Sequence, residues 1–188
     1  MVTISRWYGV VVAVACGVLL AGCVTDPADV PSSTPTSPPP LFESQDDALA
    51  AATEAYAGYM ETTETVMEEG GVNIDRIDDY VSPEMSQIER DGIAEMVGAG
   101  RKFVGRSTFG PLLVQSYEPF TADGLGKIIV YVCVDISTGD LLDKEGVSVI
   151  DTSRELASTF EVSFDVNDER RTLQVAKAHQ LSGVSVCG

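Results

Sequence analysis

Residues 127–136, with the sequence KIIVYVCVDI, decide the fold because they read as one long β-strand in the middle of a sheet. The first half of this stretch is apolar on both faces, which is typical of a central strand covered on both sides. Side chains alternate along a strand, so Tyr131, Cys133 and Asp135 share one face. A central strand needs neighbours on both edges, and the flanking sequence supplies them.

After residue 101 the helical period of apolar residues disappears, and β-branched and aromatic residues alternate between turn signals. Phe160, Val162 and Phe164 alternate with polar residues as in a half-exposed strand, and the Asn-Asp-Glu sequence at 167–169 predicts a hairpin turn. The C-terminal half is therefore predicted to form a mostly antiparallel sheet. Its strands are expected at residues 102–108, 112–118, 127–137, 154–166, 171–181 and 183–187.

The residues before this sheet predict helices. A long amphipathic helix begins after Ser44, which resembles a capping box with Asp47, and the glycines at 70–71 end it. A second helix begins after Ser82, with Pro83 at its first position. We also expect a helical turn over residues 74–81 and an end of the second helix near residues 98–100. The side chains expected to face inward from the two helices are Leu49, Ala52, Tyr56, Tyr59, Met60, Thr63, Val66, Met85, Ile88, Ile93, Met96 and Val97.

Helices followed by a meandering sheet predict an α+β domain, in which N-terminal helices pack on a curved, mostly antiparallel sheet in two layers. The element order over residues 44–187, the long first helix with its Ala and Tyr residues, and the YVCVD strand resemble the nuclear transport factor two-like superfamily. The resemblance implies a cone-like sheet closed on one side by helices. Members include polyketide cyclases and steroid isomerases with acid/base residues inside the cone, but also non-catalytic pockets and assembly modules, so the fold does not choose the function.

Residues 1–22 have the form of a signal peptide. One charge, Arg6, precedes an apolar run over residues 7–20, which is shorter than the roughly 20 residues of a spanning helix and lacks a basic flank. The sequence LAGC at 20–23 resembles the bacterial lipobox. That resemblance implies a diacylglyceryl group on the Cys23 sulfur, acyl chains such as palmitate, and cleavage before Cys23, as in actinobacterial-type lipoproteins. An uncleaved anchor helix is the alternative.

Residues 24–40 read VTDPADVPSSTPTSPPP and predict a tether, because the proline density blocks both helix and strand pairing. As polyproline II at about 3.1 Å per residue, the tether reaches up to roughly 50 Å. Its Ser and Thr residues make glycosylation an alternative to a plain hydrophilic spacer. The predicted domains are a cleaved signal peptide at 1–22, the lipidated cysteine and tether at 23–43, and one globular domain at 44–188.

The chain has four cysteines, and two of them lie in or at the end of the signal segment, Cys16 and Cys23. Cys133 and Cys187 remain, and two thiols in an oxidising compartment predict one disulfide. This bridge would close a loop of about 55 residues and contribute roughly 4 kcal/mol in the chain-entropy model. A catalytic thiol is disfavoured because valines flank Cys133 on both sides.

The composition is acidic, with 29 Asp and Glu against 12 Lys and Arg and a net charge of −17. Removing residues 1–22 deletes Arg6, which leaves 29 acidic against 11 basic residues and a net charge of −18. This field repels nucleic acid, so nucleic-acid binding is excluded as a function. The acidic residues are spread along the chain, which indicates a solvated surface instead of a recognition patch.

Motifs of the common enzyme classes are absent from the sequence: it has no G-x-S-x-G, H-E-x-x-H, phosphate-binding glycine loop or C-x-x-C. His179 is the only histidine, which excludes a His-based metal cage, and we expect no cofactor or metal. Asp135 is the sharpest catalytic candidate, since a carboxyl group buried in a cone would have a raised pKa and suit proton abstraction. The favoured interpretation is that Asp135 is a strand-end residue and that His179 is an ordinary structural or surface histidine.

A candidate pocket can be written from the residues that a cone would enclose. Tyr131, Asp135 and His179 lie on predicted neighbouring strands, and Tyr56 and Tyr59 lie on the first helix, where helical spacing also suits plain core packing. The favoured hypothesis is a non-enzymatic binding or assembly module, anchored by lipid to the cell membrane on its extracytoplasmic side, with an unidentified envelope protein as partner. The alternatives are a small-molecule-binding or isomerase/cyclase-like protein that uses Asp135, and a purely structural spacer.

Overall fold

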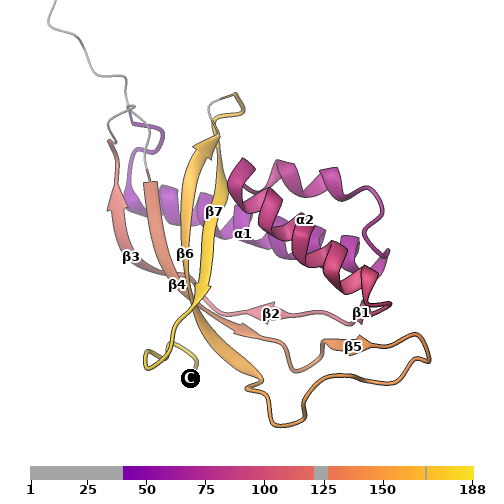
Figure 1. Cartoon of the computed structure of the whole chain (residues 1–188). Helices are drawn as coiled ribbons and strands as arrows, with labels where there is room; N and C mark the ends of the chain where they lie inside the picture. Colours follow the sequence, from indigo (N-terminus) through magenta and orange to yellow (C-terminus); the bar gives the residue numbers. More distant parts are fainter. Residues whose placement is uncertain (1–39, 121–126, 168) are drawn as a thin grey trace, which may run out of the picture. The chain divides into compact units, whose positions relative to one another are not determined.

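In the computed structural model, the decisive stretch forms strand β4, Lys127–Asp135, inside an antiparallel sheet (Figure 1). The structure describes residues 40–120, 127–167 and 169–188, all within the compact unit Ser37–Gly188. The predicted signal peptide, the lipidated Cys23 and nearly all of the tether lie outside the described residues, as does Asp168 of the predicted hairpin turn.

Within the described residues, two α-helices and one 3₁₀-helix precede the strands, in the predicted order. The helices are α1 (Gln45–Glu68), η1 (Ile74–Asp79) and α2 (Pro83–Gly98). The strands besides β4 are β1 (Lys102–Val104), β2 (Thr108–Phe109), β3 (Leu113–Glu118), β5 (Asp140–Leu142), β6 (Ala157–Asn167) and β7 (Thr172–Gln180). The predicted α+β fold is confirmed: helices cover one face of a curled antiparallel sheet (Figure 1).

The main sheet has the order β2-β4-β6-β7, and β3 also pairs with β4, so β2 and β3 share one edge of that strand. All of these pairings are antiparallel. The far edge of β7 is covered by the segment before α2, where Ser82 donates its N–H to the carbonyl of Val175 at 2.9 Å. Val175 in turn donates to the carbonyl of Tyr80 at 2.8 Å, so this edge is paired.

The core lies between the helices and one face of the sheet. On β4 the side chains of Ile128, Val130, Val132 and Val134 are all buried, while the intervening residues are only half-buried. Phe164 of β6 is fully buried beside them. Complete burial of such side chains contributes about 1.5–3 kcal/mol each.

Local capping fixes where the helices begin, as predicted. The Ser44 hydroxyl accepts a hydrogen bond from the N–H of Asp47 at 3.1 Å, and the Ser82 hydroxyl accepts one from the N–H of Met85 at 3.3 Å. A further polar contact fixes α1 against the strands, because its buried Glu64 accepts the N–H of Ser107 at 2.7 Å.

Two side chains of α2 do not point inward as predicted. Ile88 is 57% exposed and Val97 is 39% exposed. Helix α2 packs on the rest of the domain along a narrow face that includes Met85 and Ile93. The spacing of apolar residues in a sequence shows which side of a helix faces inward, but not how wide the buried part of that side is.

The strand predicted over residues 102–108 divides in two. Gly105 has φ +93°, and a Cβ there would lie 2.1 Å from the carbonyl oxygen of Thr138. The chain therefore turns at this glycine, and β1 pairs with β5, a strand that the sequence pattern did not predict, while β2 pairs with β4. The strand predicted over residues 183–187 is also wrong, since that segment is irregular.

Gly58 is a point of close contact between α1 and the segment after η1. A Cβ at this position would lie 2.1 Å from the ring of Tyr80. Gly92 in α2 offers a matched contrast, because a Cβ there would meet no atom within 4 Å.

We therefore expect opposite effects from two Gly→Ala substitutions in helices. Gly58→Ala should destabilise the domain by about 1–3 kcal/mol, because the new methyl group displaces Tyr80. Gly92→Ala should stabilise it by about 0.5–1 kcal/mol, because alanine loses less backbone entropy in a helix. Urea unfolding followed by circular dichroism measures both values, and equal effects of the two substitutions would contradict the packing described for Tyr80.

Candidate functional site

The five residues of the predicted pocket are divided between two faces of the sheet. Tyr131, Cys133 and Asp135 share one face of β4, as predicted, but they alternate with the buried valines and so lie on the face turned away from the helices. Tyr56 and Tyr59 of α1 lie on the helix side. The sheet itself therefore separates the two groups.

The two tyrosines of α1 belong to the core. Tyr56 is buried and packs edge-on against the rings of Phe109 and Phe164, with centroid distances of 5.0 Å and 6.5 Å. Tyr59 donates its hydroxyl to a carboxylate oxygen of Glu89 at 2.6 Å, which joins α1 to α2. Burial raises the pKa of Glu89, although the hydrogen bond from Tyr59 acts in the opposite direction.

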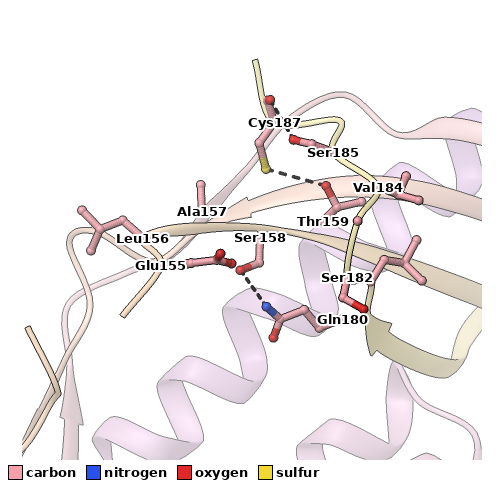
Figure 2. Close-up of a pocket in the computed structure, with 12 residues that line it drawn as sticks. Glu155, Leu156, Ala157, Ser158, Thr159, Gln180, Ser182, Val184, Ser185 and Cys187 are labelled. Atoms are coloured by element: carbon pink, nitrogen blue, oxygen red, sulfur yellow. Dashed lines mark hydrogen bonds between the residues drawn. The ribbon is translucent and has the colours of Figure 1, made fainter. Parts of the chain in front are cut away.

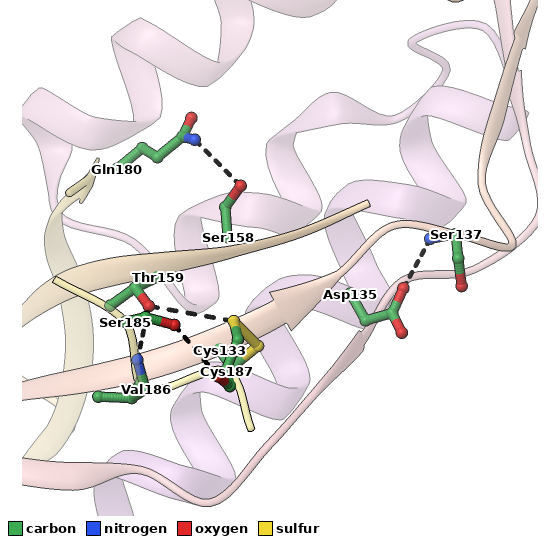
Figure 3. The surroundings of a disulfide bond; sticks show 9 residues. All are labelled: Cys133, Asp135, Ser137, Ser158, Thr159, Gln180, Ser185, Val186 and Cys187. Atoms are coloured by element: carbon green, nitrogen blue, oxygen red, sulfur yellow. Dashed lines mark hydrogen bonds between the residues drawn. A yellow bond between two sulfur atoms is a disulfide. The ribbon is translucent and has the colours of Figure 1, made fainter. Parts of the chain in front are cut away.

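Asp135 is not the buried general base that the catalytic hypothesis requires. Its carboxylate accepts the N–H of Ser137 at 2.7 Å, and hydrogen bonding with Ser137 lowers the pKa of Asp135 below its ordinary value. The raised pKa that the catalytic alternative requires is therefore not found, and the contact with Ser137 fits the favoured interpretation of Asp135 as a strand-end residue. Figure 3 shows this contact beside the disulfide.

His179 also lies on the outer face of the sheet. Its side chain is 56% exposed, and its Nε2 atom lies 3.6 Å from a carboxylate oxygen of Glu161, the residue opposite it on β6. This contact fits the interpretation of His179 as a surface histidine. Glu161 is also opposite Tyr131 on β4, so the three side chains form a row across the outer face.

The outer face carries the disulfide predicted from the cysteine count. Cys133 of β4 is bonded to Cys187, with an S–S distance of 2.00 Å. The C-terminal segment after β7 therefore crosses the outer face, where Val186 donates its N–H to the hydroxyl of Thr159 at 2.9 Å (Figure 3). This crossing is the physical reason that residues 183–187 do not form the predicted strand.

Beside this segment lies a hollow of about 680 Å³, which we call the tail hollow (Figure 2). It lies between the beginning of β6, the end of β7 and the C-terminal segment. Gln180 crosses it by donating its side-chain N–H to the Ser158 hydroxyl at 3.0 Å. Its lining residues are Glu155, Leu156, Ala157, Ser158, Thr159, Gln180, Leu181, Ser182, Gly183, Val184, Ser185 and Cys187.

A second hollow of about 350 Å³, the inner recess, adjoins the tail hollow on the helix side of the sheet. Both are lined by Ser158 and Gln180. The inner recess adds an apolar floor of Val134, Ile136 and Phe160. Together the two hollows offer polar and apolar surface at one end of the sheet, which suits binding better than acid/base chemistry.

The sequence pattern did not identify either hollow. None of the five predicted pocket residues lines them. The one available signal was Gly183, which stands inside an alternating segment and has φ +81°, a conformation that turns the chain away from the sheet.

Comparison with known proteins shows a likeness in fold to a solved structure. No model of a protein family and no curated protein matches the chain. Among solved structures, the fold is similar to the crystal structure of the intermembrane space region of the chloroplast protein ARC6, with a TM-score of 0.52. The two share 15% sequence identity, and the match covers 72% of this chain and 97% of that chain. At this identity the likeness concerns the fold alone.

The described part of the chain contains neither a metal-binding cluster nor a membrane-spanning helix. Among residues 40–120, 127–167 and 169–188, no three side chains of His, Cys, Asp or Glu are placed to hold a metal ion. Within the same residues, no helix has the length and hydropathy needed to cross a membrane.

The buried contact between Glu89 and Tyr59 predicts a pH dependence of stability. Burial raises the pKa of Glu89 in the folded state. The protonated Glu89 therefore contributes to the free energy of unfolding at low pH, and this contribution is lost as the pH rises through the raised pKa. Glu89→Gln keeps an oxygen that accepts from Tyr59 and removes the charge. We expect this variant to be more stable than the wild type at pH 8 and equally stable at pH 4.

Thermal melting from pH 4 to pH 8 measures this effect, and Glu95→Gln on the exposed side of α2 is the matched control. If the melting temperature of Glu95→Gln changed with pH as much as that of Glu89→Gln, the overall charge and not the buried contact would cause the pH dependence.

The disulfide predicts a strong dependence on reductant. It joins residues 54 apart, and the chain-entropy model gives it roughly 4 kcal/mol. Dithiothreitol should therefore lower the free energy of unfolding by about 2–5 kcal/mol, measured with urea. The double variant Cys133→Ala and Cys187→Ala should not respond to reductant. Two free thiols in the untreated protein would refute the bridge.

Proposed function

We propose that this chain is a membrane-anchored lipoprotein of the cell envelope, whose globular domain binds or assembles with a partner outside the cytoplasm. The observation that carries the proposal is the Cys133–Cys187 disulfide. Structural disulfides persist in oxidising compartments, so the bridge supports an extracytoplasmic location. It also accounts for two of the four cysteines and leaves only Cys16 and Cys23.

The position of Cys23 gives it a different role. It ends the LAGC sequence at 20–23, directly after the apolar run, and the Pro-rich residues 24–40 follow it. Two acyl chains on this sulfur would hold the protein durably, whereas one chain binds membranes only marginally. The tether would then separate the domain from the bilayer surface.

The arrangement of the domain supports a binding role. The carbonyl of Phe42 accepts the Tyr117 hydroxyl at the end of β3. The tail hollow lies at the opposite end of the sheet, beside the beginning of β6 and the end of β7.

A catalytic role has less support. The isomerase/cyclase-like alternative needs Tyr131, Asp135 and His179 in one enclosed space, but they lie on the outer face, and the pKa of Asp135 is lowered by its hydrogen bonds with Ser137. A binding or assembly module does not need such a constellation.

The anchor is tested by Cys23→Ala, with Cys16→Ala as the matched control. We expect Cys23→Ala to remove labelling by an alkyne fatty acid, and to release the protein into the medium or leave it as an uncleaved precursor. Cys16→Ala should be labelled and retained like the wild type. Fractionation with immunoblotting measures both, and normal processing with unchanged membrane retention of Cys23→Ala would contradict the proposal.

A further inference from the structure

Strand β6 extends beyond the end of its neighbour β7. The ladder between them ends at the Phe160–Gln180 pair, followed by one last bond from the N–H of Leu181 to the carbonyl of Thr159 at 2.8 Å. On its other edge β6 stays paired with β4 as far as Ala157. The beginning of β6 therefore has one paired edge, and its other edge borders the tail hollow (Figure 2).

The hydrogen-bonding directions show which backbone groups face the hollow. Leu156 accepts from the N–H of Ile136 at 2.8 Å, so its backbone groups point toward β4. Thr159 is bonded to Leu181, so its groups point toward β7. Ala157 is two residues from Thr159, and its N–H and C=O therefore point the same way, into the hollow. Within the described chain no strand residue pairs with them on that side.

The C-terminal segment would be the natural occupant of this edge if it continued β7. The register of the ladder places Gly183 opposite Ala157. The segment also has the alternating pattern of a strand, Gly-Val-Ser-Val over residues 183–186. Instead, the bond to Cys133 holds Cys187 on the outer face of the sheet. The disulfide thus keeps the edge of β6 open.

We propose that this open edge docks an extended segment of a partner protein, which runs antiparallel to β6 and takes the place that β7 leaves. The inference rests on the proposed binding role and gives it a site. The partner segment alternates small and β-branched apolar residues, as residues 183–186 do. Strand addition of this kind draws its affinity from main-chain hydrogen bonds and its specificity from pockets for alternate side chains.

The two faces of the sheet explain this pattern. In the register of β7, the position of Val184 lies on the same face as Gln180, the face of the inner recess with Val134 and Phe160. An apolar side chain there would cover the recess. The position of Gly183 lies on the outer face, where the C-terminal segment crosses, so only a small residue fits.

The probe is a fluorescein-labelled peptide with the sequence of residues 181–187 and Ser in place of Cys187. We expect saturable binding to the full mature protein in detergent, measured by fluorescence polarisation. Two N-methylated peptides provide the matched pair. Methylation at the Gly183 position removes the N–H that would bond Ala157 and should weaken binding at least tenfold. Methylation at Val184, whose N–H points away from β6, should leave binding nearly unchanged.

Two protein variants complete the test. Ala157→Pro removes the N–H that faces the hollow but no bond to β4, and should weaken binding at least tenfold. Cys187→Ser frees the chain's own C-terminal segment to occupy the edge, and should weaken binding to a similar extent. If Ala157→Pro does not fold, the peptide pair still decides the question.

Three results would overturn the docking edge: no saturable binding to the oxidised protein, equal affinities of the two methylated peptides, or equal binding by Cys187→Ser and the wild type. Any of these would leave the Cys23→Ala result unaffected. Conversely, normal membrane retention of Cys23→Ala would remove the anchor and leave the peptide measurements valid.

Discussion

The burial of one face of β4 beneath the helices is the constraint on which the rest of the structure depends. Four consecutive inward positions of this strand, from Ile128 to Val134, are removed from water and meet Phe164 and the aromatic side of α1. Each such side chain contributes about 1.5–3 kcal/mol, and a shift of the strand by one residue would expose them all. Register, sheet order and the side on which the helices lie follow from this burial.

The other face of β4 follows from the same alternation. Once the even-numbered residues are buried, Tyr131, Cys133 and Asp135 must point outward. The disulfide then draws the C-terminus across that face, and β7 ends at Gln180, in the last pair of its ladder with β6. A covalent bond on the outer face thereby shapes the tail hollow. Among the residues that the structure describes, it leaves Ala157 of β6 without a strand neighbour on that side.

The candidate site was hard to predict for a physical reason. The sequence groups residues correctly by face, since Tyr131 and Asp135 do lie together. Near the middle of β4, however, both faces carry large apolar or aromatic side chains, with Ile129 and Tyr131 on the face opposite Val130. Alternation therefore cannot tell which face meets the helices. The tail hollow is built from backbone edges and small side chains such as Ser158, and these carry little chemical signal in a sequence.

Local chemistry was readable from the sequence by itself: the serine caps of both helices, the central strand, the helices-then-sheet order and the pairing of Cys133 with Cys187. These features depend on residues that are close together in the chain or, for the disulfide, on the number of cysteines, and both can be seen in the sequence. Only the tertiary structure decided that Gly105 splits a strand, that the C-terminal segment leaves the sheet, and that an edge of β6 stays open. Those outcomes depend on residues far apart in the chain competing for the same space.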